Sequence, residues 1–502
     1  MDILSVYVWP NMQAVMVGTF VLLLVMAYAR GRKYNLPPGP PQLPILGNYF
    51  AFTKDQRLFT VFEEMTKKYG DIFTVNLGFG HNSIVVSSDH LVDEMLVEKS
   101  EEFAGRDTSL WSAYLLSDGH KDIAFADYCP MWALQRNMAV KGLRSYLLSG
   151  KLNCLAKSAF EEVAPLLAKQ TEPVDVDLYT TLLIYNIICT VAFGKSYKFD
   201  DPEFLWLKEK LAEIMTVLFG SRLPADILPF LKHVPIPSTR RAKEIRNEMI
   251  DFQRRMLKEH EASLNPENVR DLTDQLLLAR QDHGTTNDGD VKKVLTDDCI
   301  IQIVLDTFIG GVIASRETFK WLLLYVADKP DVQEKMHLEI MDVFDVDDLN
   351  QSKAKMKYCE AVFKETLRIR PATPCTLAHK ALRDTTLGGY DIPKGTVVYP
   401  NLWVIHRDPR NWESPEEFKP ERFLTKDGAL EKIDPKIWRP FSAGKRKCMG
   451  EAIARSNLMI AIAMFFRQFK VAVPPGQKLD LDPDMYQIHC VSKPQKIAIN
   501  SW

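Results

Sequence analysis

The stretch "FSAGKRKCMGEAIARSNLMIAIAMFFRQF", residues 441 to 469, places Cys448 between a glycine-containing loop and a long apolar segment that reads as a helix. Backbone N–H groups at the start of a helix, with the positive end of its dipole, favour a thiolate over a thiol. Gly444 and Gly450 keep the loop thin enough for a flat cofactor, and Arg446 offers a guanidinium to an anionic group. Cys448 is therefore the candidate metal ligand.

The composition is that of a globular chain with a large core: 502 residues, of which 46% are hydrophobic and 25% charged. A formal net charge of -2 gives no general attraction for nucleic acid, so we expect no nucleic-acid partner. The 8 cysteines are scattered and form no CxxC pair, unlike those of a disulfide scaffold. We expect free thiols in a reducing compartment.

Residues 1–33 are predicted to be a membrane anchor. The segment is almost continuously apolar, and the predicted span, about residues 11–29, is close to the roughly 20 residues that a helix needs to cross a bilayer. Arg30, Arg32 and Lys33 follow at once, which places the rest of the chain in the cytosol. The alternative, a cleaved signal peptide, lacks its basic start and its small-residue cleavage site. In a eukaryotic cell this predicts a single-pass protein of the endoplasmic reticulum membrane with a cytosolic catalytic domain.

The rest of the chain divides into a hinge and a body. Residues 34–45 are rich in proline and are predicted to be a stiff hinge. Residues 46–502 show long helical patterns with short strand-like runs, "DIFTVNL" (71–77) and "SIVVSS" (83–88), and are predicted to form one domain that is mainly α with small β-sheets. The apolar stretch 218–237 is expected either to dip into the membrane beside the anchor or to join the core.

The spacing around the cysteine resembles that of a known family. The FxxGxRxCxG pattern of the cytochrome P-450 family is matched at every defined position by Phe441, Gly444, Arg446, Cys448 and Gly450. Because five positions agree at fixed spacing, this signal is highly specific.

Two more motifs occur in the family's order. "KETLR" (364–368) resembles the family's ExxR helix, and "FKPERF" (418–423) resembles its PERF motif. The resemblance covers residues 36 to 502, so it implies the cytochrome P-450 fold, with 46–502 as a haem-binding catalytic domain. The animal microsomal group that contains steroid 17-alpha-hydroxylase/17,20-lyase and the xenobiotic-oxidising enzymes is resembled most, in "EEFAGRD", "KDIAFADYCPMW" and "NLWVIHRDPRNWESPEEF".

The resemblance implies a haem b cofactor whose iron is bound by the Cys448 thiolate, a ligand that favours O–O cleavage. "MWALQRN" (131–137) resembles the family's WxxxR helix, whose Trp132 and Arg136 would pair with a haem propionate. His379 matches a strand position that does the same. The other expected cofactor contacts lie in the cysteine loop, at Phe441, Arg446 and Gly450.

A structural ion pair is expected on the ExxR helix. Glu365 and Arg368 are three residues apart, hence on one helix face, where an ion pair can form. The resemblance implies that Arg422 completes a buried triad behind the haem.

The electrons are expected from another protein, because the sequence contains no convincing glycine motif for a dinucleotide or a flavin. The expected donor is NADPH–cytochrome P-450 reductase, which uses NADPH, with cytochrome b5 as a second candidate partner. Basic residues beside the cysteine and beyond the WxxxR helix are expected to form the docking face. They are Lys141, Arg144, Lys445, Arg446 and Lys447.

A long helix is predicted from about Asp297 to the residue before Pro330, with Gly310 and Gly311 near its middle. Each glycine costs a helix interior about 1 kcal/mol relative to alanine, so the pair needs a reason. In cytochromes P-450 this helix crosses the distal face of the haem, and its [AG]GxxT segment makes room for dioxygen. The resemblance assigns that catalytic role to Gly310 and Gly311.

The acid and the threonine that follow in the family are replaced here by Ile313 and Ala314. Those two groups normally help to deliver protons during oxygen activation, so the usual relay is missing. A first way to replace it is a relay through Glu317 and Thr318, which lie four residues later on the same faces and about 6 Å further along the helix.

Two alternatives to this relay stay open. In one of them, Ser315 or a hydroxyl group of the substrate supplies the proton. In the other, the enzyme does not insert oxygen but performs isomerase or lyase chemistry, such as rearranging a peroxide or breaking a C–C bond. A catalytically silent haem-binding protein, a carrier or sensor, is the alternative from another class.

The residues expected to line the distal pocket are apolar or weakly polar, namely Ile309, Ile313, Ala314 and "PCTL" (374–377). Such a pocket suits a lipophilic small molecule, which can enter from the membrane lipid. The sequence therefore predicts a membrane-anchored monooxygenase that inserts one oxygen atom from O2 into a sterol or steroid. A fatty acid or a xenobiotic is the alternative substrate.

Overall fold

The computed structural model describes residues 15, 18, 19, 34–43, 47–52, 57–77, 82–148, 151–219, 223–282, 295–345, 348–484 and 488–502. The predicted membrane span lies almost entirely outside these residues, so it stays a prediction. Within them, two helices are long and apolar enough to cross a membrane, Val176–Phe193 (α7) and Asp297–Asp328 (α13). Their apolar windows are 78% and 67% buried inside the protein, so both are core helices.

Helices make up most of the described chain, as predicted. The α-helices are α2 (Leu58–Tyr69), α3 (Asp89–Asp93), α4 (Trp111–Leu116), α5 (Pro130–Leu148), α6 (Lys151–Ala168), α7 (Val176–Phe193), α8 (Pro202–Ile214), α9 (Pro224–Ile227), α10 (Pro237–Ser263), α11 (Leu272–Asp282), α13 (Asp297–Asp328), α14 (Pro330–Val343), α15 (Leu349–Lys355), α16 (Lys357–Ile369), α17 (Leu402–Ile405) and α18 (Glu451–Gln468). Shorter turns are the 3-10 segments η1 (Tyr49–Phe52), η4 (Pro229–His233), η5 (Pro420–Phe423) and η6 (Gly444–Arg446), and the π segments η2 (Glu94–Glu98) and η3 (Met215–Phe219).

The strands are short and form small sheets, which is also the predicted class. They are β1 (Ile72–Asn76), β2 (Asn82–Val86), β3 (Gly105–Arg106), β4 (Val174–Asp175), β5 (His379–Lys380), β6 (Thr385–Leu387), β7 (Tyr390–Ile392), β8 (Val397–Pro400), β9 (Phe469–Ala472) and β10 (Lys496–Ser501). The largest sheet has the order β1-β2-β8-β5-β3, in which only β2 and β8 are parallel. The sheet therefore joins β1, β2 and β3, from the N-terminal part of the chain, to β5 and β8, which lie about 300 residues later.

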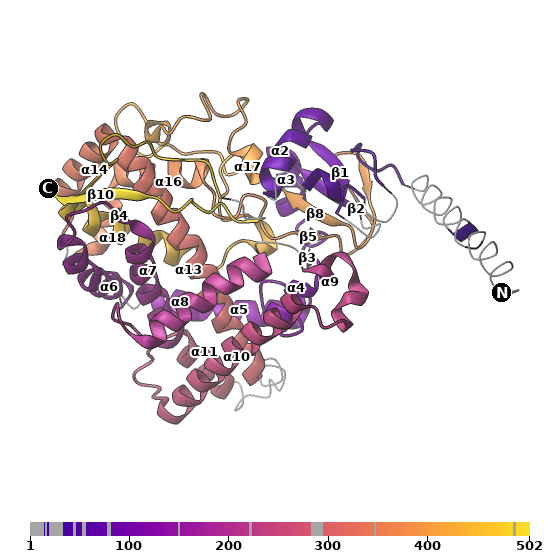
Figure 1. Cartoon of the computed structure of the whole chain (residues 1–502), viewed down its shortest axis with the longest axis horizontal. Helices are drawn as coiled ribbons and strands as arrows, with labels where there is room; N and C mark the ends of the chain where they lie inside the picture. Colours follow the sequence, from indigo (N-terminus) through magenta and orange to yellow (C-terminus); the bar gives the residue numbers. More distant parts are fainter. Residues whose placement is uncertain are drawn as a thin grey trace, which may run out of the picture.

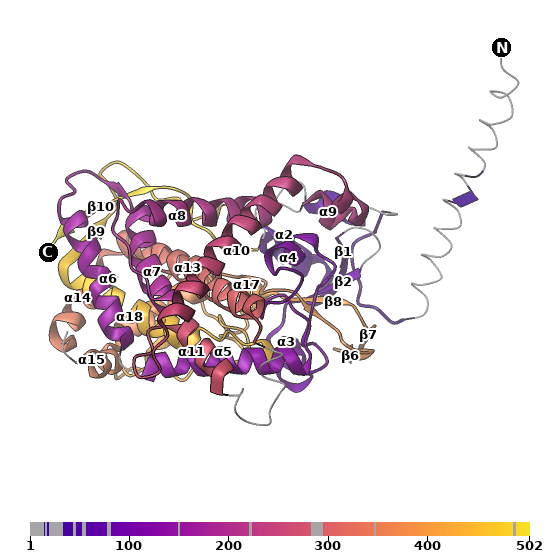
Figure 2. The ribbon, with the colours of Figure 1, turned by 90° about the horizontal axis from the view of Figure 1, so that it is seen from below.

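The sheet and the helices occupy different ends of the molecule. Figure 1 shows the five-stranded sheet with α2 and α3 at one end, and α6, α14, α16 and α18 at the other. In both views the long helix α13 runs through the middle, and Figure 2 shows α7 beside it. α13 packs most extensively against α7, so these two apolar helices form the centre of the core.

The ends and the glycines of α13 have local causes. The Thr296 side chain caps the first turn by accepting a hydrogen bond from the Cys299 N–H at 3.3 Å, and the helix ends at Asp328, two residues before Pro330. A Cβ at Gly311 would lie 3.1 Å from the side chain of Ile188 on α7. Gly311 therefore allows the two helices to approach, which is a packing role, whereas a Cβ at Gly310 would meet nothing within 4 Å.

A buried ion pair joins α10 to α11. His260 Nε2 lies 2.8 Å from Asp271 Oδ2, and Nδ1 lies 2.7 Å from the Met256 carbonyl oxygen. Asp274, whose ligand atoms are also within 4.8 Å, is engaged by Arg270 at 2.8 Å. Both nitrogens of the histidine are occupied, so these contacts describe a structural junction. Burial lowers the pKa of His260, but the hydrogen bond to Asp271 and its charge outweigh burial and raise it overall.

We predict that this junction weakens at alkaline pH. Because the folded-state pKa is raised, the stabilisation is complete below the unfolded pKa of about 6.5 and is lost as pH rises through the folded value. His260→Gln should cost about 3 kcal/mol of local stability at pH 6 and less at pH 9. Hydrogen exchange of the backbone amides of α11 measures this loss of local stability. His90→Gln, at an exposed histidine, is the control. An equal cost at both pH values would contradict the prediction.

Candidate functional site

Cys448 lies in a loop that short-range contacts hold in shape. The loop runs from Phe441 through η6 to the start of α18, and the Cys448 N–H donates to the Phe441 carbonyl oxygen at 2.9 Å. Gly444 has φ +67°, and a Cβ there would overlap the carbonyl oxygen of Leu96 in η2. Gly450 has φ -89°, and a Cβ there would only reach 4.0 Å from the Cys448 sulfur. Of the two glycines expected to keep the loop thin, the geometry requires Gly444.

The electrostatics of Cys448 differ from the expectation. Its surface is exposed, but protein surrounds the sulfur closely enough that burial raises the pKa of the thiol. The N–H groups of Gly450 and Glu451 at the start of α18 oppose this, as the sequence suggested, and so does Arg136. Burial outweighs them because it removes most of the water that would stabilise a thiolate. The cysteine is thus a thiol until a cation binds beside it.

Strand register brings two basic residues together next to this loop. β3 pairs with β5 so that Arg106 is opposite His379, and both are buried. Arg106 donates to the carbonyl oxygens of Ala124 at 2.9 Å and Leu377 at 3.0 Å, while His379 Nδ1 lies 2.8 Å from the Phe103 carbonyl oxygen. His379 was predicted as a site residue and Arg106 was not. Its only signal was its place in "EEFAGRD".

Three more predicted residues adjoin these two. The Arg446 guanidinium lies 3.8 Å from the centre of the Trp132 ring and donates to the carbonyl oxygens of Ala104 and Ala126, each at 2.7 Å. Arg136, one turn after Trp132 on α5, donates to the carbonyl oxygen of Lys447. The structure therefore brings Trp132, Arg136 and Arg446 together beside the cysteine.

These cations are buried with too little negative charge around them. Burial, followed by the positive charge of Arg446, lowers the pKa of Arg106 well below its usual range. Burial and Arg136 lower the pKa of Arg446 to about 10. Burial and then Arg106 lower the pKa of His379 far below its usual value. Lost hydration and mutual repulsion therefore destabilise every charge in the cluster.

Such a cluster of buried cations fits an anionic ligand. This allows a test of whether the residues present fit the expected haem. Asp122 and Asp127 favour the charged guanidiniums of Arg106 and Arg446 but do not outweigh burial, and Asp127 is already paired with Lys380 at 2.6 Å. A group with two carboxylates would supply the missing negative charge. The two propionates of a haem would do so, and Cys448, the candidate iron ligand, adjoins the cluster. The residues present fit the cofactor.

Behind this site, the predicted structural residues form a buried network. Glu365 and Arg368 are completely buried on α16, with Nε and Oε2 separated by 2.7 Å. Arg422 of η5 lies 3.1 Å from Glu365 Oε1, and Arg368 also donates to the carbonyl oxygen of His406 at 2.8 Å. These contacts tie α16 to the segment that precedes the cysteine loop. The network acts by positioning that loop.

Next to its glycine pair, α13 exposes small residues and has no acid at position 313. Gly310 is exposed and Ala314 is partly exposed, whereas Ile313 and Ser315 are only 3% and 5% exposed. The face of α13 that a flat cofactor could approach is therefore made by Gly310 and Ala314. Ile313 and Ser315 point into the protein.

The contacts of Glu317 and Thr318 are those of structural residues. Glu317 is 1% exposed; its Oε1 lies 2.9 Å from Arg316, and its Oε2 accepts the Ser492 N–H at 3.0 Å. The Thr318 hydroxyl donates to the Ala314 carbonyl oxygen at 2.8 Å. A relay through either side chain would first have to break these bonds, because no oxygen of theirs is exposed on the distal face.

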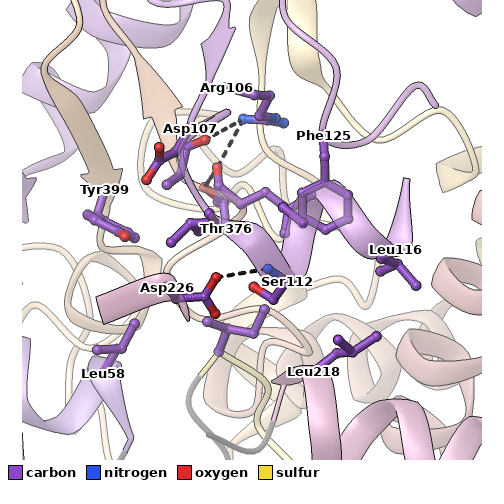
Figure 3. A pocket seen from close by; sticks show the side chains of 15 residues that line it. Leu58, Arg106, Asp107, Ser112, Leu116, Phe125, Leu218, Asp226, Thr376 and Tyr399 are labelled. Carbon is purple, nitrogen blue, oxygen red and sulfur yellow. Dashed lines mark hydrogen bonds between the residues drawn. The ribbon is translucent and has the colours of Figure 1, made fainter. Parts of the chain in front are cut away.

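A pocket opens beside the cation cluster, with about 820 Å³ of empty space including solvent at its mouth (Figure 3). Thr376 and Leu377 of the predicted "PCTL" run line it, but Ile309, Ile313 and Ala314 do not, which corrects that expectation. The Ile309 and Ile313 side chains are buried in the core, with only 7% and 3% of their surface exposed. Most of the wall comes from other elements, including Leu58, Arg106, Asp107, Ser112, Leu116, Phe125, Leu218, Asp226 and Tyr399.

Comparisons with known proteins agree with this arrangement. The family model described as cytochrome P-450 matches residues 37–499. The steroid 17-alpha-hydroxylase/17,20 lyase of Ictalurus punctatus is 34% identical over 475 residues, covering 92% of this chain and 90% of the relative. Cytochrome P-450 1A1 of Rattus norvegicus is 31% identical over 504 residues, covering 95% and 94%. A solved zebrafish cytochrome P-450 with progesterone superposes with a TM-score of 0.76 at 29% identity, covering 88% of this chain and 99% of that one.

We predict that the two loop glycines respond differently to alanine. Gly444→Ala should destabilise the loop by about 1–3 kcal/mol from its backbone conformation, with more from the overlap at Leu96, and should sharply reduce haem retention. Gly450→Ala, its matched control, should retain haem like the wild type. The haem-to-protein absorbance ratio after purification measures both. Similar ratios for the two variants would contradict the proposed loop geometry.

Proposed function

The chain belongs to the cytochrome P-450 family and is a haem-using monooxygenase, and from that premise we propose that it oxidises a lipophilic substrate, a sterol or steroid, at a membrane. One oxygen atom of O2 enters the substrate, and the electrons come from NADPH through a reductase. The observation that carries the proposal is the exposed Cys448 thiol beside a buried cluster of under-compensated cations. That combination suits a thiolate-bound haem with two propionates.

The residues that would hold the haem follow from the contacts. Cys448 would bind the iron, and Arg106, His379 and Arg446 would hold the propionates, with Trp132 and Arg136 beside them. Phe441 would contact the ring from the cysteine loop, in which the space at Gly450 is open enough for a methyl group. Haem bound in this way supplies the O2 chemistry, and its thiolate ligand favours O–O cleavage. As a ligand, Cys448 would bind as the thiolate, because the charge of a bound metal would outweigh the burial that favours the thiol.

The pocket supports a lipophilic substrate. Leu58, Leu116 and Leu218 give it apolar walls, and Arg106, the one cationic side chain among the described lining residues, would already be engaged by a haem propionate. A substrate carboxylate would therefore find no cationic partner among the described lining residues, which disfavours a fatty acid. The names of the relatives and of the solved structure with progesterone point the same way, towards a steroid.

Membrane attachment and partners are also proposed. The predicted anchor of residues 11–29 would place the catalytic domain on the cytosolic face of the endoplasmic reticulum. The stretch 218–237 ends on the surface, where Phe230 is 61% and Val234 is 43% exposed, so its last part is free to contact lipid. Lys141 and Arg144 on α5 are exposed and suit a reductase docking face.

A second candidate function is favoured by one observation. The distal face of α13 presents Gly310 and Ala314, with no hydroxyl or acid at positions 313 and 314. If protons cannot be delivered there, isomerase or lyase chemistry becomes the better account. A silent haem-binding protein would show neither reaction.

Labelled dioxygen distinguishes these candidates. We expect the protein without residues 1–33, supplied with reductase and NADPH, to place one labelled oxygen atom in a steroid product. Cys448→Ala should abolish the reaction, since the iron loses its thiolate ligand. Product without label would favour isomerase or lyase chemistry instead. NADPH consumption with no product from any sterol, steroid or fatty acid would count against the monooxygenase proposal.

Reversal of charge tests the docking face. Lys445 and Lys447 are already paired with Glu101 at 3.1 Å and Glu451 at 2.8 Å, so they contribute less positive charge than expected. Lys141→Glu with Arg144→Glu should therefore raise the reductase concentration needed for half-maximal turnover about tenfold at low salt. Lys470→Glu, in β9 at the other end of the molecule, is the matched control. An unchanged value at low salt would exclude α5 from the docking face.

A further inference from the structure

Between Cys299 and Ser315, a stretch described throughout, α13 is buried except along one stripe of the helix. The stripe consists of Asp306, Thr307, Gly310, Gly311 and Ala314. Its members are three or four residues apart, so they share one face. Gly310 is the most exposed of them. This stripe is therefore the accessible face of α13, and in the proposed function it is the face that would meet the haem.

Asp306 is the only titratable residue of the stripe. It lies four residues before Gly310 and eight before Ala314, hence about 6 Å and about 12 Å away along the helix axis. The other acid near the glycines, Glu317, is one of the buried structural residues described above. Of the acids on α13 near the glycines, Asp306 alone lies on the accessible face.

One oxygen of Asp306 is fixed and the other is not. Oδ2 accepts the N–H groups of Ile123 at 2.9 Å and Ala124 at 3.1 Å. Oδ1 has no hydrogen bond to any described residue. The side chain is therefore oriented through Oδ2, and Oδ1 can carry a proton without disturbing these bonds.

A second carboxyl group lies behind the first. Asp122 is completely buried, and its Oδ2 accepts the Phe125 N–H at 2.8 Å. Its Oδ1 is buried without any hydrogen-bond partner among the residues that the structure describes. A buried acceptor without a donor is destabilising, and a proton held by the pair would supply that donor.

Burial of the two carboxyl groups and the repulsion between them favour a bound proton. Burial, and then the negative charge of Asp122, raise the pKa of Asp306 well above its usual range. Burial also raises the pKa of Asp122 to about 6, although Arg106 and Arg446 are near enough to favour its ionised form. Two carboxyl groups that repel each other titrate as a pair and retain a proton between them. Propionates on those arginines would strengthen the effect by cancelling their positive charge.

We propose that Asp306, backed by Asp122, holds and delivers the proton on the distal face in place of the groups absent at Ile313 and Ala314. In this step the proton leaves the Asp306 carboxyl group for a water or substrate oxygen beside Gly310. The carboxylate that results is neutralised by a proton from solvent, shared with Asp122, before the next turnover. The inference rests on the proposed oxygen insertion, for which it supplies the missing acid.

Asp306→Asn is the decisive variant, because its amide oxygen still accepts the N–H groups of Ile123 and Ala124 but carries no acidic proton. Product formed per NADPH should fall about 10²-fold, the usual contribution of a general acid, with peroxide released instead. Asp306→Glu should restore most of the coupling. In the wild type, coupling should decline as pH rises above about 6, the pKa of Asp122, because the pair then loses its proton, and in Asp306→Asn it should be independent of pH.

A structural role alone would give different results. If Asp306 only anchored residues 123 and 124, Asp306→Asn would keep wild-type coupling at every pH, and the proposal would be wrong. Haem content and the carbon monoxide difference spectrum of each variant show whether the site is intact. A fall in coupling counts as support only where both match the wild type, and Asp306→Glu then serves as the second variant.

Infrared spectroscopy tests the proton without turnover. At pH 7 the wild-type chain, with and without haem, should show the carbonyl band of a protonated carboxyl group, and Asp306→Asn should lose it. Absence of the band in the wild type would overturn the proposal, whatever the reaction. If the band is present but no labelled oxygen reaches any product, the proposed function fails while the proton-holding pair stands.

Discussion

The hydrogen bonding of residues 122–126 is the constraint on which both sides of the site depend. The carbonyl oxygens of this segment accept from Trp132 and from two guanidiniums, while its N–H groups at 123 and 124 donate to Asp306. One short peptide therefore links the cations beside the cysteine loop to the distal helix α13. Because the same few residues bond to both, a shift on one side must be felt on the other.

The charges of the site are unbalanced within the protein, and this imbalance defines the ligand. Arg106, Arg446 and His379 are buried with lowered pKa values, since burial and mutual repulsion both act against their charged forms. On the distal face the imbalance has the opposite sign, because Asp122 and Asp306 repel each other. A haem with two propionates would complete the first group. The second group would be completed by a proton, which is the species that the proposed oxygen insertion requires.

Much of the fold and of the candidate site could be predicted from the sequence, because the residues that identify them lie close together in the chain. The helix of the glycine pair, the ExxR ion pair and the cysteine loop each depend on residues a few positions apart, where helix periodicity and fixed spacing are informative. Glu365 and Arg368 contact each other for this reason. Arg106 was missed because nothing in its own neighbourhood marks it. It joins His379, 273 positions later, only through the pairing of β3 with β5.

The predicted proton relay through Glu317 and Thr318 shows most clearly what the sequence could not establish. Periodicity places Glu317 and Thr318 on the same faces as Ile313 and Ala314, but it does not say which faces are covered. Packing of α13 against α7 and the bonds to Arg316 and Ser492 bury them. The same packing leaves Asp306 and Gly310 accessible.

By itself, then, the sequence determined the family and the helices that carry the site, and it marked Cys448 as the candidate ligand, because these depend on short spacings and on hydropathy. The tertiary structure decided which charged side chains are buried together and which face of α13 meets the ligand. Those properties depend on contacts between residues far apart in the chain, and on the loss of water around them. No single stretch of residues encodes these long-range contacts or the loss of water that follows from them.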